Sequence, residues 1–167
     1  LYLGTFGSFI GYAAGFPLLI KSQFPQVNPL QYAWLGPLVG AIVRPFGGWL
    51  ADKLGGARVT LWNFVVMALA VVGVLFYLPS GISGGNFAGF LTMFLFLFLT
   101  TGIGNGSTFR MIPVIFATER SREAAGKGEF ALEQALKDGN KEAAAVLGFA
   151  GAVGAYGGFF IPKSYGT

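Results

Sequence analysis

The chain has 167 residues, of which 54% are hydrophobic and 11% are charged, and its formal net charge is +4. Soluble domains carry about 25% charged residues, so this balance indicates a protein embedded in a lipid bilayer. The absence of cysteine and histidine excludes a disulfide framework, the common zinc and haem ligand sets, and thiol or imidazole catalysis, so we expect no metal and no cofactor. The basic residues flank apolar runs instead of forming one patch, and nucleic acid is not an expected partner.

Five apolar runs are long enough to cross a membrane as helices, which predicts an all-α, polytopic membrane protein. They cover residues 1–20, 30–50, 59–78, 87–118 and 142–162. The chain begins with Leu1 inside the first run, so we expect it to be a fragment of a longer protein. In that run, glycines spaced by four residues share one helix face, where a second helix can approach closely. Tyr2 and Phe6, also four residues apart, place two rings on one side of the same helix.

The second run contains one uncompensated cation, Arg44. Asp52 follows eight residues later, which places the guanidinium about 12 Å inside the membrane. An arginine at such depth costs at least about 2.5–3.5 kcal/mol and normally faces a wet cavity or an opposite charge. The interiors of the other apolar runs contain no Asp or Glu. We therefore expect Arg44 to bind an anion; the alternatives are an arginine that snorkels to the headgroups or one paired with a carboxylate.

The fourth run changes character halfway along. Its first half, residues 87–99, is rich in phenylalanine and is expected to face lipid. Its second half contains glycines, hydroxyls, Asn105 and Arg110, and polar helix at membrane depth is expected to line a cavity or to pack on another helix. Residues 119–141 form the only strongly polar stretch, which is predicted to be a loop with a short amphipathic helix lying near the membrane surface.

The fifth run contains five glycines, Gly148, Gly151, Gly154, Gly157 and Gly158. Each costs roughly 1 kcal/mol of helix propensity, so this run needs either close backbone packing or bare backbone that faces a ligand.

The loops 51–58 and 119–141 carry most of the basic residues and are predicted to be cytoplasmic by the positive-inside rule. Counted from these loops, Arg44, Arg110 and Gly148–Gly151 all lie about 9–14 Å into the membrane, and Tyr2 lies close to the same layer. Cations, rings and glycines thus gather at one depth, as a small-anion site requires.

Two segments match known signatures. The segment GGWLADKLGGAR (residues 47–58) resembles the G-x-L-a-D-r-x-G-x-r signature of the major facilitator superfamily. The segment GFAGAVGAYGGFFIPKSYG (residues 148–166) resembles the glycine-rich nitrate signature of NarK-type nitrate/nitrite porters, and residues 1–19, 30–48 and 102–116 are similar to other helices of that family. The resemblance implies helices 7 to 11 of a twelve-helix transporter in the cell inner membrane. The N-terminal half and helix 12 would then lie outside this chain, and the full-length protein is expected to be a monomer.

The resemblance also implies which residues bind substrate. In this family nitrate or nitrite is held between two arginines, one from each half, and the C-terminal arginine matches Arg44. The other matching substrate-binding positions are the aromatic pair Tyr2 and Phe6 and the glycines Gly148, Gly151 and Gly154. Arg110 departs from the family pattern and is a secondary candidate, which either lines the pathway or anchors to helix ends.

Three positions of the facilitator signature, Gly48, Asp52 and Arg58, are implied to act in the conformational change. The family resemblance implies that Asp52 makes a charge contact that helps to stabilise one conformer. The alternative is an ordinary carboxylate at a helix end.

The predicted function is therefore transport of nitrate and nitrite by alternating access, and not catalysis. Exchange of nitrate against nitrite is favoured over proton-coupled nitrate uptake, because the interiors of the spans contain no Asp, Glu or His that could carry a proton. A facilitator for another small inorganic or organic anion is the alternative within the same class. A membrane enzyme is poorly supported because every carboxylate lies in a loop or at a helix end, and the costly intramembrane arginine argues against a purely structural subunit.

Overall fold

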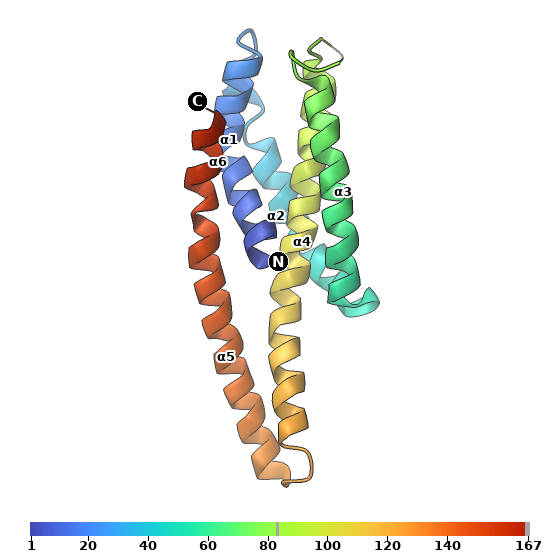
Figure 1. Cartoon of the computed structure of the whole chain (residues 1–167), viewed down its shortest axis with the longest axis vertical. Helices are drawn as coiled ribbons and strands as arrows, with labels where there is room; N and C mark the ends of the chain where they lie inside the picture. Colours follow the sequence, from blue (N-terminus) through green and yellow to red (C-terminus); the bar gives the residue numbers. More distant parts are fainter. Residues whose placement is uncertain (83, 166–167) are drawn as a thin grey trace.

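The computed structural model describes residues 1–82 and 84–165, except for the side chain of Tyr165, and the last position of the nitrate signature, Gly166, lies outside them. All regular elements in these residues are helices, and Figure 1 shows them running roughly parallel to one long axis. They are η1 (Leu3–Gly7, a π-helix), α1 (Ser8–Gln23), η2 (Pro29–Gln31, a 3-10 helix), α2 (Leu35–Leu54), α3 (Gly56–Tyr77), α4 (Phe87–Glu123), α5 (Glu129–Ala155) and α6 (Gly157–Tyr165).

Four of the described segments are long and apolar enough to cross a membrane: Leu3–Gln23, Gly56–Tyr77, Phe87–Glu123 and Glu129–Ser164. The prediction of an all-α, polytopic membrane protein is confirmed. Helix α2, the second predicted span, is not among the four; its 20 residues include Arg44, Asp52 and Lys53. It nevertheless lies within the bundle, where its neighbours include α3 and α4.

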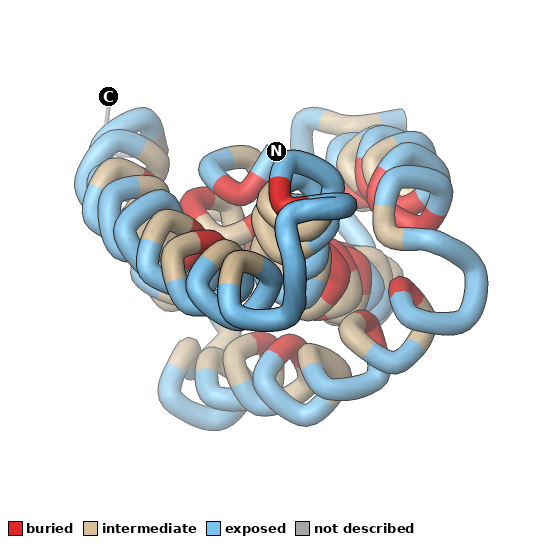
Figure 2. Tube along the Cα trace, turned by 90° about the horizontal axis from the view of Figure 1, so that it is seen from below, coloured by how far each residue is buried: buried red, intermediate tan, exposed pale blue. Residues whose placement is uncertain are grey.

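Helix α4 is the central element, with α2, α3, α5 and η1 packed around it. Figure 2 shows buried positions on the inward faces of the helices and exposed positions around the periphery. The main core cluster combines Phe90, Phe94 and Phe98 of α4 with Phe16 of α1, whose ring stacks on Phe94 at a centroid distance of 4.4 Å. The expectation that the first half of α4 faces lipid is therefore wrong for these phenylalanines, which recur every fourth residue and point inward.

The connection between α2 and α3 is tighter than predicted. The predicted loop 51–58 reduces to Gly55, because α2 continues to Leu54 and α3 begins at Gly56. Gly55 has φ 89°, a backbone conformation that favours glycine, and this explains how the chain reverses direction at one residue. Asp52 thus belongs to the last turn of α2.

The polar stretch 119–141 is not a surface loop with a separate helix, so that prediction is wrong. Residues up to Glu123 continue α4, a five-residue turn with positive φ at Gly126 and Gly128 follows, and α5 starts at Glu129. At 1.5 Å per residue the 37 residues of α4 span about 55 Å, well beyond a hydrocarbon core of about 30 Å. Figure 1 shows α4 and α5 extending together past the ends of α1, α2 and α3 as a helical hairpin.

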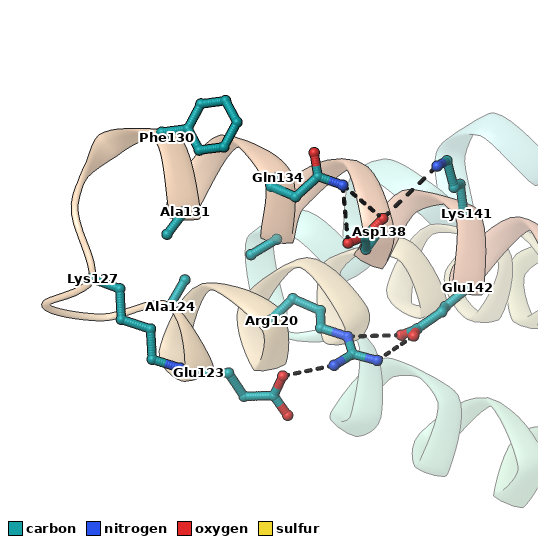
Figure 3. Close-up of a pocket in the computed structure, with 11 residues that line it drawn as sticks. Arg120, Glu123, Ala124, Lys127, Phe130, Ala131, Gln134, Asp138, Lys141 and Glu142 are labelled. Carbon is teal, nitrogen blue, oxygen red and sulfur yellow. Dashed lines mark hydrogen bonds and ion pairs between the residues drawn. The ribbon is translucent and has the colours of Figure 1, made fainter.

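Charged side chains hold this hairpin together (Figure 3). Arg120 of α4 donates from Nε to Glu142 of α5 at 3.0 Å and also pairs with Glu123 at 2.7 Å. Beside this network lies a cleft of about 650 Å³, and Phe130 at its rim is 83% exposed. Backbones approach closely at Gly139, where an added Cβ would lie 3.0 Å from the carbonyl oxygen of Phe116.

Candidate functional site

A cavity of about 600 Å³ lies between α2 and α4, and Arg44 is one of its lining residues. Arg44 is partly exposed to this cavity, and among the described residues no carboxylate lies within ion-pair distance of it. The cavity also contains Gly48, Asp52, Phe109 and Arg110. Two of the predicted cations, Arg44 and Arg110, therefore line one cavity, and within the described part of the chain Arg44 has no carboxylate partner.

Glycines at the contact between α2 and α4 fix the backbone that carries Arg44. A Cβ added at Gly106 would lie 2.8 Å from the carbonyl carbon of Arg44, 3.0 Å from the amide nitrogen of Gly48, and closer still to the Arg44 carbonyl oxygen. Gly47 and Gly102 likewise have the backbone of the opposite helix where a Cβ would be. The two helices therefore pack backbone to backbone, as small residues allow in membranes.

Tyr2 connects Arg44 to the aromatic pair. The Tyr2 side chain lies close enough to the Arg44 guanidinium for the two to interact electrostatically. Its ring stacks on Phe6, with centroids 5.2 Å apart and planes 10° apart, and lies 6.4 Å from the ring of Phe109. Tyr2 and Phe6 are carried by η1 and its flank, and π-helical turns often occur at functional sites.

The three predicted glycines of α5 differ in their surroundings. Gly154 is buried, and a Cβ there would lie 2.7 Å from Cδ1 of Phe6, so this glycine gives the aromatic pair its room. In contrast, nothing in the described residues lies within 4 Å of a Cβ built at Gly148 or Gly151. The structure therefore brings Gly154 to Phe6, while the other two glycines border open space.

Arg110, the secondary candidate, pairs with Asp52. Its Nε donates to both carboxylate oxygens, at 3.0 and 3.1 Å, and the two side chains are 61% and 46% exposed. The pair links α4 to the last turn of α2 at the cavity that also contains Arg44. Arg58, by contrast, is exposed near the start of α3 and lines a different groove.

Buried polar side chains in the second half of α4 contact neighbouring helices, and the sequence predicted these contacts only in part. The Thr5 and Thr108 hydroxyls are 3.2 Å apart and the Thr60 and Ser107 hydroxyls 3.1 Å apart, all buried, so the second half of α4 is tied to η1 and α3. Hydroxyl residues within a glycine-rich helix were the only sequence signal for these pairs. Asn105 is fully buried, and neither polar atom of its side chain has a hydrogen-bond partner in the described part of the chain.

No group of three or more metal-ligating side chains occurs within the described residues. Among these residues the site offers a guanidinium without a carboxylate partner, an adjacent phenol with its stacked ring pair, and close-packed glycine backbone.

No protein-family model matches the chain. It is 52% identical over 169 residues to the nitrate/nitrite transporter NarU of Salmonella typhimurium, which covers all of this chain and 36% of that protein. It is 52% identical to NarU of Escherichia coli, over 99% of the chain and 36% of the relative. It is 37% identical to a probable nitrate/nitrite antiporter, NarK2 of Thermus thermophilus, over 95% of the chain and 32% of the relative. The chain thus spans about a third of the length of these relatives, and it belongs to the family of NarK-type nitrate/nitrite porters.

Proposed function

We propose that this chain forms helices 7 to 11 of a transporter that moves nitrate and nitrite across a membrane by alternating access. The observation that carries the proposal is Arg44, a cation without a carboxylate partner among the described residues, which lines a cavity between α2 and the membrane-spanning helix α4. A charge at this predicted depth in the membrane is expensive unless a ligand or water compensates it. The names of the relatives supply the anion class.

The side chains around Arg44 suit a small planar anion. A guanidinium presents parallel N–H donors that match two oxygens of nitrate or nitrite, which a lysine ammonium does not. The Tyr2 hydroxyl is next to Arg44 and adds a donor, and the stacked rings of Tyr2 and Phe6 offer a flat apolar surface. The second arginine of the clamp is expected in the N-terminal half of the full-length protein.

Arg110 and Asp52 are proposed to hold one conformer of the transport cycle. Their ion pair joins α2 and α4 beside the Arg44 cavity, so opening the cavity on that side would require the pair to break or to move as a unit. Sequence position places this pair toward the cytoplasmic surface. The conformational roles of Gly48 and Arg58 stay predictions, as do the substrate contacts of Gly148 and Gly151.

Exchange of nitrate against nitrite is the mode that we favour, because the interiors of the spans lack Asp, Glu and His. Proton-coupled nitrate uptake would need a proton carrier in the N-terminal half. Preloading liposomes with nitrite or imposing a pH gradient separates the two modes: nitrite inside should accelerate nitrate entry, and a proton gradient alone should not drive it.

The test of the site is anion flux in liposomes that contain the full-length protein or its Arg44→Lys or Arg44→Ala variant. Loss of one charge-assisted pair should weaken binding by about 1.5–3 kcal/mol, which is roughly 10- to 150-fold. Arg122→Lys is the matched control, because Arg122 is exposed near the tip of the α4–α5 hairpin. Normal transport of nitrate and nitrite by both Arg44 variants would overturn the proposal. Transport of another small anion in preference to nitrate would favour the alternative substrate class.

A further inference from the structure

A second groove, of about 550 Å³, runs between α2, α3 and α4 and shares no lining residue with the Arg44 cavity. Its walls are mainly aliphatic and aromatic: Leu50, Leu54, Trp62, Val66, Leu99 and Ile103. Its two uncharged polar residues make internal contacts. The Thr100 hydroxyl donates to the carbonyl of Leu97 at 2.8 Å, and the Asn63 amide points to the sulfur of Met67 at 4.0 Å. The groove therefore offers hydrocarbon-like walls.

One end of this groove carries a positive charge. Arg58 lines it near the start of α3, is exposed, and has no ion-pair partner among the described residues. Trp62, one helical turn further along α3, is 68% exposed and lines the same groove. Indole rings favour the membrane–water interface, and a cation next to them lies at the level of lipid phosphates. The groove is thus cationic at the helix end and apolar further in.

The surroundings favour lipid as the occupant. Helix α3 is apolar on all sides, and its exposed face continues along Leu61, Val65, Leu69 and Val72. Such a surface in a membrane protein is covered by acyl chains. Anionic headgroups bind basic pockets between membrane helices on the cytoplasmic side, where sequence position places Arg58.

We propose that this groove binds an anionic phospholipid of the surrounding bilayer. Its phosphate pairs with the Arg58 guanidinium, which matches phosphate oxygens with two parallel hydrogen bonds, and one acyl chain lies along Leu54, Val66 and Leu99. The inference does not depend on nitrate transport, because the groove and the Arg44 cavity have no lining residue in common. It assigns a lipid site to the outer surface of the α2–α3–α4 unit.

The test measures lipid retained by the purified full-length protein in native mass spectrometry. Phosphatidylglycerol and phosphatidylethanolamine are supplied in equal amounts, with inorganic phosphate as a separate arm. We expect phosphatidylglycerol to be retained preferentially, and Arg58→Gln to reduce its binding by about fivefold, the effect of one basic residue at a membrane surface. Lys53→Gln is the matched control, since Lys53 is exposed in the same helix–turn–helix but does not line the groove. Inorganic phosphate should not displace the lipid, because it lacks the acyl chain.

A second variant tests the apolar part independently. Leu99→Trp fills the groove without changing any charge and should reduce phosphatidylglycerol binding while Arg58 is intact. Thermal unfolding of each variant reports whether it is folded, and Arg58→Lys, which keeps the charge, should retain more lipid than Arg58→Gln. Equal retention of the two lipids, or phosphatidylglycerol binding unchanged by Arg58→Gln, would overturn the proposal. Displacement of the lipid by inorganic phosphate would show an anion site without an acyl groove and would also overturn it.

Discussion

Replacing Gly106 with alanine tests whether the close approach of α2 and α4 holds Arg44 in place. The new Cβ would lie 2.8 Å from the carbonyl carbon of Arg44 and closer still to its carbonyl oxygen, whereas ordinary contact begins at 3.4 Å, so α2 must move by well over 0.6 Å. The obstructing atoms belong to helical backbone, which has no alternative rotamer. Overpacking of this kind costs about 1–3 kcal/mol, and the gain in helix propensity from glycine to alanine returns about 0.5–1 kcal/mol. The difference between these two terms is about 0–2.5 kcal/mol, and a clash with helical backbone belongs in its upper half, so we expect a net loss of stability of about 1–2.5 kcal/mol.

Thermal unfolding of the full-length protein measures the stability loss, and nitrate uptake into liposomes measures the consequence for the site. Gly106→Ala should lower Tm and raise KM for nitrate, because it displaces the backbone that carries Arg44. Gly148→Ala is the matched control for stability: it is also a glycine in a long helix, but nothing in the described residues lies within 4 Å of its Cβ. Its Tm should be unchanged or slightly higher, because alanine favours the helix.

Equal Tm values for Gly106→Ala and Gly148→Ala would refute the argument that backbone contact fixes α2 against α4. A lower Tm with an unchanged KM would show that the contact stabilises the protein but does not position Arg44 for nitrate binding.

Three further changes have defined outcomes. Asp52→Asn and Arg110→Gln should each alter nitrate transport. Because the pair is exposed, a double-mutant cycle on the free energy of unfolding should give a coupling energy of only about 0.2–1 kcal/mol. A coupling energy near zero for both unfolding and transport would contradict the gating role. Asn105→Leu should leave Tm unchanged or raise it, since the buried amide makes no hydrogen bond in the described residues, and a large fall in Tm would show an unrecognised partner. Tyr2→Phe removes the hydroxyl beside Arg44 but keeps the ring stack, so KM for nitrate should rise with Tm preserved, and an unchanged KM would exclude a substrate contact.

Local spacing explains what could be predicted from the sequence. The four-residue separation of Tyr2 and Phe6 was sufficient to place their rings together, and they stack as expected. Glycines of the first span were expected to admit a second helix. Gly7 and Gly11 do so, because the backbones of α5 and α6 lie directly against them. Helical periodicity determines such relations without any knowledge of the tertiary fold.

Relations between distant segments could not be predicted in the same way. Lipid-facing and buried side chains of a membrane protein are equally apolar, so hydropathy could not show that Phe94 and Phe98 point into the bundle. A hydropathy profile also shows which residues can lie within the membrane, but it does not show where a helix ends. Helix α4 continues to Glu123 and α5 begins at Glu129, and cross-helix pairs such as Arg120 with Glu142 link these parts only because the two helices lie side by side.

The same reason applies to the site. Arg44 was singled out by its depth, and Asp52 and Arg110 by a family signature and a polar run. Their pairing across 58 residues became visible only in three dimensions. In the structure the Arg110 guanidinium is held by a carboxylate and also lines the cavity, and the two alternatives for its role in transport stay predictions.

Helix α5 is held at two points, and two glycines between them border open space. Glu142 is bound by Arg120, Gly154 packs against Phe6, and nothing in the described residues lies within 4 Å of a Cβ built at the intervening Gly148 or Gly151. A helix segment with bare backbone between two fixed points is where another part of a transporter can approach or where the helix can bend. We therefore expect Gly151→Ala to retain Tm but to slow nitrate flux in liposomes, the reverse of a packing defect. Unchanged flux at unchanged Tm would show that this open face takes no part in transport.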